Sequence, residues 1–185
     1  MSTEQLERDL APLAQTLRKI VIVLLVSVVG MTVAMAFLRS QGKEGWNFSE
    51  GGVVTLTALA VAIAAPLLGT VISRQVVTTN RRKLATGESD SSAGQAKKSQ
   101  KKAKEADIES LAMLYQTKTI ILASILHGAA YFNAIAFMIE GDLLTIVAGG
   151  LLAVGIASQF PTVTRVANWV EDQLGRLQED RAQSR

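Results

Sequence analysis

The stretch "TIILASILHGAAYFNAIAFMI", residues 119–139, runs for 21 residues without an aspartate, glutamate, lysine or arginine. A helix needs roughly 20 apolar residues to cross about 30 Å of hydrocarbon. Three other uncharged runs are of similar length: 19 residues from Ile20 to Leu38, 23 from Gly51 to Ser73, and 22 from Leu143 to Thr164. Because backbone polar groups inside lipid must be satisfied within the segment, each run should be helical. The sequence therefore predicts an all-α integral membrane protein with four transmembrane helices.

The lysines and arginines are distributed unevenly among the segments outside these runs. Of the 19, 17 lie before the first run, between the second and third runs, or after the fourth run, and 2 lie in the other two connections. Positively charged residues stay on the cytoplasmic side of a membrane. We therefore expect both termini and residues 74–118 to be cytoplasmic, with the two short connections on the opposite side.

The predicted chain has five parts. They are a cytoplasmic amphipathic helix (1–19), a first transmembrane hairpin (20–73), a basic cytoplasmic loop that is partly disordered before it becomes helical (74–118), a second hairpin (119–164) and a cytoplasmic amphipathic tail (165–185). The first part has an apolar stripe at helical spacing, formed by Leu6, Leu10, Leu13 and Leu17. Pro12 predicts a bend in it. A signal peptide cleaved after Ala36 is the alternative, but the preceding segment has no net positive charge, so we expect this helix to be retained.

The tail has the pattern of an amphipathic helix at a membrane surface. One side carries Val166, Trp169, Val170, Gln173, Leu174 and Leu177, and the other carries acids and arginines. Tryptophan is common at the level of the lipid headgroups, so Trp169 is expected to be an interfacial anchor. Pairing with a partner in a coiled coil is the alternative, but the apolar stripe is too short to favour it.

The two predicted hairpins resemble each other. Residues 18–38 and 117–138 share a lysine at the start, a glycine near the middle and Ala-Phe near the end, and the second helix of each hairpin contains a proline, Pro66 or Pro161. This pattern indicates either a parallel duplication or a chance similarity between apolar helices. Small residues recur every four positions in the fourth run, which predicts a close-packing face formed by Thr145, Gly149, Ala153 and Ala157.

Residues 81–107 contain eight lysines and arginines, four acids and no aromatic residue. This composition favours a solvated linker whose lysines fix the topology. The alternative is that it also binds anionic lipid headgroups, through Lys97, Lys98, Lys101, Lys102 and Lys104. Nucleic acid is not expected as a partner, because no aromatic side chain is available here to stack on bases.

His127, the only histidine, lies inside the third run. An ionisable group within a span is costly, and for that reason it is a functional candidate. Asn133 is the other strongly polar residue of this run, and it lies about 120° around the helix from His127. The two therefore do not form one polar ladder. Hydrogen bonding to neighbouring helices is favoured over a role in transport or proton movement.

Several classes of chemistry are excluded by the residues that are missing. Cysteine is absent, which rules out disulfides and thiolate chemistry, and a single histidine leaves too few ligands for a metal site. There is no phosphate-binding loop, dinucleotide fingerprint, nucleophile elbow or HExxH motif. We therefore predict no catalytic residues, no metal, no cofactor and no enzymatic activity.

The second half of the chain carries a resemblance. Residues 115–142, "YQTKTIILASILHGAAYFNAIAFMIEGD", and 160–174, "FPTVTRVANWVEDQL", resemble a group of uncharacterised small bacterial membrane proteins, notably from planctomycetes. In that group a segment like "LLEGAAFFNLIAY" precedes a last helix ending in "FPTRxRVxxW". The resemblance implies a four-helix protein of the bacterial inner membrane and implies no activity. Relatives often have a glutamate where this chain has His127, so a role that needs an intramembrane carboxylate is not supported.

These observations favour a multi-pass membrane protein that acts as a non-enzymatic scaffold or accessory subunit. Its expected partners are the lipid bilayer with its anionic headgroups, and either another membrane protein or further copies of the chain. The alternative is a small oligomeric channel or transporter that uses the polar residues near His127. Low intramembrane polarity and extensive cytoplasmic segments favour the scaffold.

Overall fold

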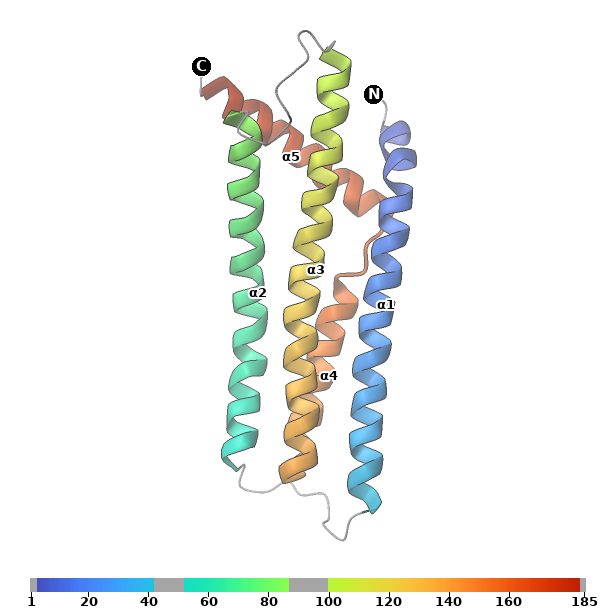
Figure 1. The fold of residues 1–185 in the computed structure, drawn as a ribbon, viewed down its shortest axis with the longest axis vertical. Helices are drawn as coiled ribbons and strands as arrows, with labels where there is room; N and C mark the ends of the chain where they lie inside the picture. Colours follow the sequence, from blue (N-terminus) through green and yellow to red (C-terminus); the bar gives the residue numbers. More distant parts are fainter. Residues whose placement is uncertain (1–2, 42–51, 87–99, 184–185) are drawn as a thin grey trace. The chain divides into compact units, whose positions relative to one another are not determined.

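A computed structural model of the chain describes residues 3–41, 52–86 and 100–183. These ranges form five α-helices and no strand (Figure 1): α1 (Thr3–Gln41), α2 (Val53–Thr86), α3 (Gln100–Glu140), α4 (Leu143–Ser158) and α5 (Val163–Gln183). The predicted all-α class is confirmed for this part of the chain. Helices α1, α2 and α3 are each long and apolar enough to cross a membrane, and there is a fourth candidate span if the bent pair α4 and α5 is counted as one.

The chain divides into two compact units. The first unit consists of residues 1–17, 73–119 and 161–185, and the second consists of residues 18–72 and 120–160. Helices α1, α2 and α3 each contribute residues to both units, α4 belongs to the second unit, and α5 belongs to the first. The uncharged runs therefore lie mainly in the second unit, and most of the charged residues lie in the first.

The second unit has a core of small and branched apolar side chains, with α3 between α1 and α2 (Figure 1). The buried members of this core are Val21, Val28, Ala65, Leu122, Leu126, Ala129, Ala130, Leu152 and Ile156. Alanine and glycine let the helices approach closely, as in many membrane-spanning bundles. At Gly69 an added Cβ atom would lie 2.6 Å from Leu122 Cδ1, so α2 and α3 are close there.

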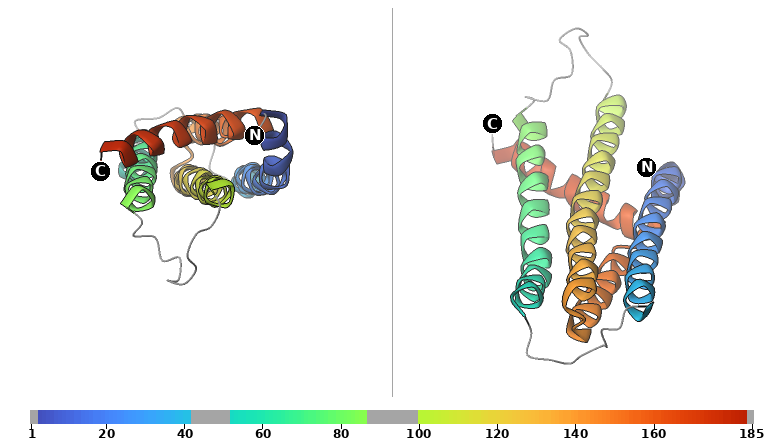
Figure 2. Two further views of the ribbon diagram at one scale, coloured as in Figure 1. Left: turned by 90° about the horizontal axis from the view of Figure 1, so that it is seen from above. Right: turned by 60° about the horizontal axis from the view of Figure 1, so that its bottom comes forward.

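The first unit is built on longer apolar side chains. Its large buried apolar side chains come from α1, α3 and α5, and include Leu6, Leu10, Leu17, Leu111, Tyr115, Val166, Val170 and Leu177. Within this unit α5 lies across the other helices (Figure 2). Two ion pairs hold it there: Arg81 Nε to Asp180 Oδ2 at 2.9 Å, and Arg181 Nη1 to Asp107 Oδ2 at 2.7 Å.

Helix α2 is longer than the uncharged run predicts. The expected loop begins at residue 74, whereas α2 continues to Thr86. Arginine and lysine are good helix formers, so the charge that marks the end of a span does not end the helix. Residues 87–99, which include Lys97 and Lys98, lie outside the described residues. Helix α3 begins at Gln100 and contains the other three predicted lipid-binding lysines, whose side chains are also outside the described set.

Helix α4 is shorter than predicted. The fourth uncharged run extends to Thr164, but α4 ends at Ser158 after 16 residues. Pro161 explains the early end, because proline has no N–H to donate and clashes with the carbonyl four residues earlier. The amides of Gln159 and Phe160 instead close the last turn by bonding three residues back, at 3.0 Å each. Helix α2, by contrast, continues through Pro66.

The predicted small-residue face of α4 is only half right. Its buried positions are Thr145, Gly149, Leu152 and Ile156. Ala157, which was expected on this face, is exposed, and Ala153 is half-buried. An α-helix turns every 3.6 residues, so a strict four-residue spacing drifts off the buried side within three turns.

Candidate functional site

His127 belongs to a polar cluster in the second unit that joins α3 to α1. Its Nε2 atom lies 2.7 Å from Ser27 Oγ, and its ring lies against that of Tyr131 with centroids 4.5 Å apart. The Ser27 hydroxyl also lies 3.0 Å from the Leu24 carbonyl, and the Tyr131 hydroxyl donates to the Ser27 carbonyl at 3.3 Å. If Ser27 donates to Leu24, neutral His127 with its proton on Nε2 donates to Ser27. The cluster thus fits hydrogen bonding between helices.

Asn133 joins α3 to α2. The side chain is fully buried, and its Nδ2 atom donates to the Ala58 carbonyl at 3.2 Å and to the Ala129 carbonyl at 2.9 Å. Gly149 of α4 packs on its Cβ atom, where an added Cβ would lie at 3.7 Å. His127 and Asn133 therefore face different helices, as their spacing predicts. Neither lies within hydrogen-bonding distance of the other in the contacts described here.

A third polar cluster of the second unit, which the sequence pattern does not reveal, lies where α1 and α3 end and α2 begins. Arg39 is buried and donates through Nη1 to the Met138 carbonyl at 2.8 Å, so it provides a hydrogen-bond donor for a carbonyl in the last turn of α3. Glu140 accepts the amides of Val54 at 3.0 Å and Thr55 at 2.8 Å, which are orphan donors at the start of α2. The hydrogen bonds from Thr55 and then Val54 hold the pKa of Glu140 below its usual value.

The connection between α3 and α4 completes this cluster. Asp142 is the N-cap of α4 and accepts the Leu144 amide at 2.9 Å. Gly141 has φ +73°, a conformation that side chains rarely adopt, and a Cβ there would meet the Arg39 guanidinium. The signal available in the sequence was the Asp-Leu boundary, a typical N-cap before an apolar run. The partners Arg39 and Val54 could not be identified from it.

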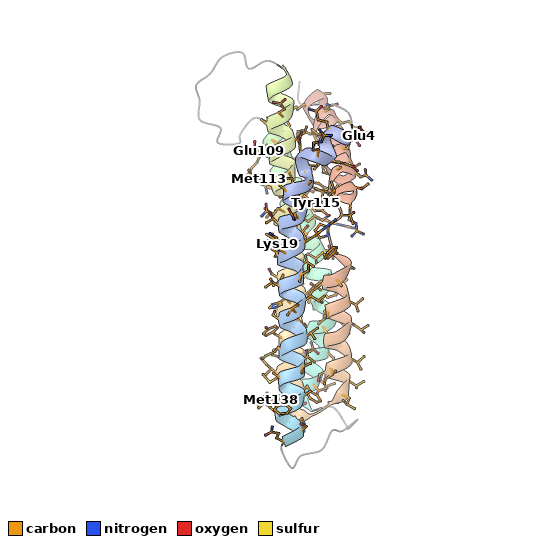
Figure 3. All side chains as sticks on the ribbon, turned by 90° about the vertical axis from the view of Figure 1, so that its right-hand side faces the viewer. Glu4, Lys19, Glu109, Met113, Tyr115 and Met138 are labelled. Carbon is orange, nitrogen blue, oxygen red and sulfur yellow. The ribbon has the colours of Figure 1, made fainter. Side chains whose placement is uncertain are left out.

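A groove in the first unit lies between α1 and α3, and we call it the acidic groove. Its volume is about 480 Å³. Its lining includes four apolar residues, Leu10, Leu13, Ile108 and Ala112, and three residues with carboxylates, Asp9, Glu105 and Glu109. Among the side chains that the structure describes, which do not include those of residues 87–104, no lysine or arginine lines it. Figure 3 shows Glu109 and Met113 on α3, near α1. Met113 is 57% exposed and also lines the groove.

The apolar side of α5 is occupied by protein contacts. Five of the six residues predicted on this side are buried, and Trp169 is half-buried. The Trp169 ring packs edge-on against Tyr115 with centroids 5.2 Å apart, and Lys118 Nζ lies 5.6 Å from its centroid. The amphipathic pattern therefore directs packing within the first unit. Placement of the Trp169 ring at lipid headgroups stays a prediction.

Comparisons with known proteins add no assignment. No protein-family model matches the chain, and no match was found among curated proteins or solved structures. Within residues 3–41, 52–86 and 100–183, no group of three histidine, aspartate or glutamate side chains is placed to hold a metal ion. The planctomycete-type resemblance and the non-enzymatic role therefore stay predictions.

Proposed function

We propose that this chain is a four-span protein of the bacterial inner membrane that holds a partner protein on its cytoplasmic side, as a scaffold or accessory subunit. The observation that carries the proposal is the acidic groove with its exposed methionine. The proposed partner element is a basic amphipathic helix. No catalytic residue, metal or cofactor is assigned.

The membrane part of the proposal is supported by the surface of the second unit. Large apolar side chains are exposed along α1, α2 and α4, for example Val23 at 66%, Ile63 at 69% and Leu151 at 68%. A helix that is apolar on all sides is suited to a large core or to a membrane. The orientation follows from the 17 lysines and arginines in the segments assigned to the cytoplasm and the 2 in the others.

The partner part is supported by a contrast within the first unit. Among the described residues of the first unit, Met113 is the only large apolar side chain that is exposed. Exposed large apolar side chains are numerous in the second unit. Methionine is adaptable and is frequent at surfaces that bind helices. An amphipathic helix docks by placing apolar side chains in a groove of this kind. The three carboxylates that line the same groove favour lysines or arginines on the flanks of that helix.

The alternative, a channel or transporter, finds less support. A channel or transporter needs polar groups that can contact a solute. The two strongest candidates for such groups are already hydrogen-bonded to neighbouring helices. His127 bonds across to α1 through Ser27, and Asn133 bonds across to α2 through the Ala58 carbonyl. Such bonds contribute about 0.6 kcal/mol on average to helix association and are common in membrane bundles.

The test uses the full chain in its native membrane. A photo-crosslinking amino acid is placed at Met113, and a matched one at Leu151, which is exposed on α4. We expect the first to yield one defined protein adduct and the second to yield lipid adducts. The Met113 adduct should fall at least tenfold when Asp9→Lys and Glu109→Lys are introduced together.

The matched control is Glu171→Lys combined with Glu179→Lys, two exposed acids on α5 outside the groove. This variant changes the charge equally and should leave the adduct within twofold of wild type. Absence of any protein adduct at Met113, or equal losses in the two charge-reversal variants, would contradict the proposal.

A further inference from the structure

A second cavity of the first unit has the opposite charge, and we call it the basic pocket. Its volume is about 420 Å³, within the range of about 300–1,000 Å³ that is usual for small-ligand sites. Four cationic side chains line it, Arg74 and Arg81 from α2, Lys118 from α3 and Arg176 from α5. Trp169 forms part of its wall, and no aspartate or glutamate of the described ranges lines it.

Two of the four cations are already paired. Arg81 donates to Asp180 at 2.9 Å and to Gln173 Oε1 at 3.2 Å. Arg176 bonds to Asp172 at 3.1 Å, but both side chains are more than half exposed, so this pair contributes little. These bonds hold the guanidinium groups at the pocket while leaving some of their donors for a ligand.

Arg74 and Lys118 have no carboxylate partner among the residues that the structure describes. The Lys118 ammonium instead lies near two aromatic rings, 5.6 Å from the centroid of Trp169 and 6.0 Å from that of Tyr115. Burial, followed by the charges of Arg165 and Arg74, lowers the pKa of Lys118. Burial and the neighbouring positive charges therefore both disfavour the charged form of Lys118. A bound anion would relieve the repulsion between these cations.

The position in the sequence indicates which anion is available. Arg74 is the first charged residue after the second uncharged run, which ends at Ser73, and Lys118 directly precedes the third run, which starts at Thr119. In a protein spanning the membrane through these runs, both cations lie where the cytoplasmic headgroups begin. Phosphate groups are concentrated at that level, and basic pockets between spans on this side suit them. Tryptophan is also favoured at this depth.

We propose that the basic pocket binds a phosphate group, with Arg74 and Lys118 as the principal contacts and Arg81 and Arg176 at its sides. The favoured source is the headgroup of an anionic phospholipid, and a soluble phosphate is the other source of the same chemistry. Arginine suits this role because its planar guanidinium can give two parallel hydrogen bonds to one phosphate. The four contacts do not include any of the lysines at 97–104 that the sequence predicts to bind headgroups. The lipid source rests on the proposed membrane insertion, whereas phosphate binding does not.

The experiment uses the tryptophan in the pocket wall as the reporter. The chain has two tryptophans, and Trp46→Phe leaves Trp169 alone. The full chain with this substitution is placed in phosphatidylcholine nanodiscs that contain increasing fractions of phosphatidylglycerol. A parallel sample in neutral detergent is titrated with inorganic phosphate and with glycerol 3-phosphate. Trp169 emission should change in a saturable way, and the change should weaken with added salt.

The variant Arg74→Gln with Lys118→Gln should weaken binding at least tenfold. The matched control, Arg8→Gln with Lys19→Gln, removes the same charge from exposed positions outside the pocket and should stay within twofold. Lys118→Arg keeps the positive charge and should preserve binding. This variant separates the loss of charge at this position from a change in the side chain itself.

The arms of the experiment separate the two sources. Saturation by phosphatidylglycerol alone supports a headgroup site, and saturation by the soluble phosphates with competition against the lipid supports a soluble ligand. No saturable change with any of the three, or equal weakening in the control variant, overturns the proposal. The crosslinking at Met113 is independent of this result, so failure here and failure of the scaffold proposal are distinguishable.

Discussion

The two units use the same three long helices but differ in what they bury and what they expose. The second unit buries alanines such as Ala129 and Ala130 and exposes valines and leucines, whereas the first buries Leu6 and Leu111 and exposes charged residues. Lipid is as apolar as leucine, so helices in a membrane gain from close contact rather than from hiding apolar surface. In water, burial of large apolar side chains is the main favourable term. This difference is the one expected if the second unit lies in lipid and the first unit lies in water.

The largest expected effect concerns topology and is all or none. The chain has no cysteine, so single cysteines can be introduced at three exposed positions, Gln41 of the second unit and Glu4 and Glu171 of the first. A membrane-impermeant thiol reagent added to intact cells should label Gln41→Cys only. Labelling of Glu4→Cys or Glu171→Cys from outside would reverse the orientation proposed for the two units.

The next effect separates a buried apolar side chain of the first unit from an exposed apolar side chain of the second. Leu111 is fully buried in the first unit, and Leu111→Ala should lower the free energy of unfolding by about 2–5 kcal/mol because it leaves a cavity. Val26 is 64% exposed in the second unit, and Val26→Ala should change it by less than about 0.5 kcal/mol. Denaturant titration in detergent, followed by circular dichroism, measures both. Similar losses in the two variants would remove the distinction between the units.

A smaller effect is expected at His127, inside the second unit. His127→Leu removes the bond to Ser27 and should cost at most about 1–2 kcal/mol of helix association. Combined with Ser27→Ala, it should cost little more than either change alone, because both remove the same hydrogen bond. Reconstituted vesicles should show no pH-dependent flux in the wild type. A flux that disappears in folded His127→Leu would favour the transporter instead.

The smallest effect is expected at Glu140, the last residue of α3. Its pKa lies below the ordinary 4.5 because Thr55 and Val54 donate to the carboxylate, so ionisation favours the folded state. That contribution is present above the ordinary pKa and is lost as the pH falls through the lower folded value. Glu140→Gln should therefore melt below wild type at neutral pH, and the gap should close under acid conditions. Exposed Glu4→Gln serves as the control, and a gap that is independent of pH contradicts this account.

Much of the architecture could be predicted because it depends on local patterns. Uncharged runs identify helices of spanning length, and the stripe on residues 165–185 matches the buried side of α5 in five of six positions. Helix ends were less predictable. The charged residues from Arg74 onward do not end α2, because a charge that is unfavourable inside a membrane is still compatible with an α-helix. The end of α4 at Ser158 follows from Pro161, a signal that was present but was outweighed by run length.

Composition and periodicity were sufficient to establish the helical class, the candidate spans and the buried side of α5, because each depends on residues a few positions apart. The sites proposed here depend on tertiary structure. Asp9 and Glu109 line one groove although they come from different helices, and Arg74, Lys118 and Trp169 line one pocket although each comes from a different helix. A charge acquires a function from the charges and surfaces around it, and the neighbours of these residues are set by how the helices pack rather than by their spacing along the chain.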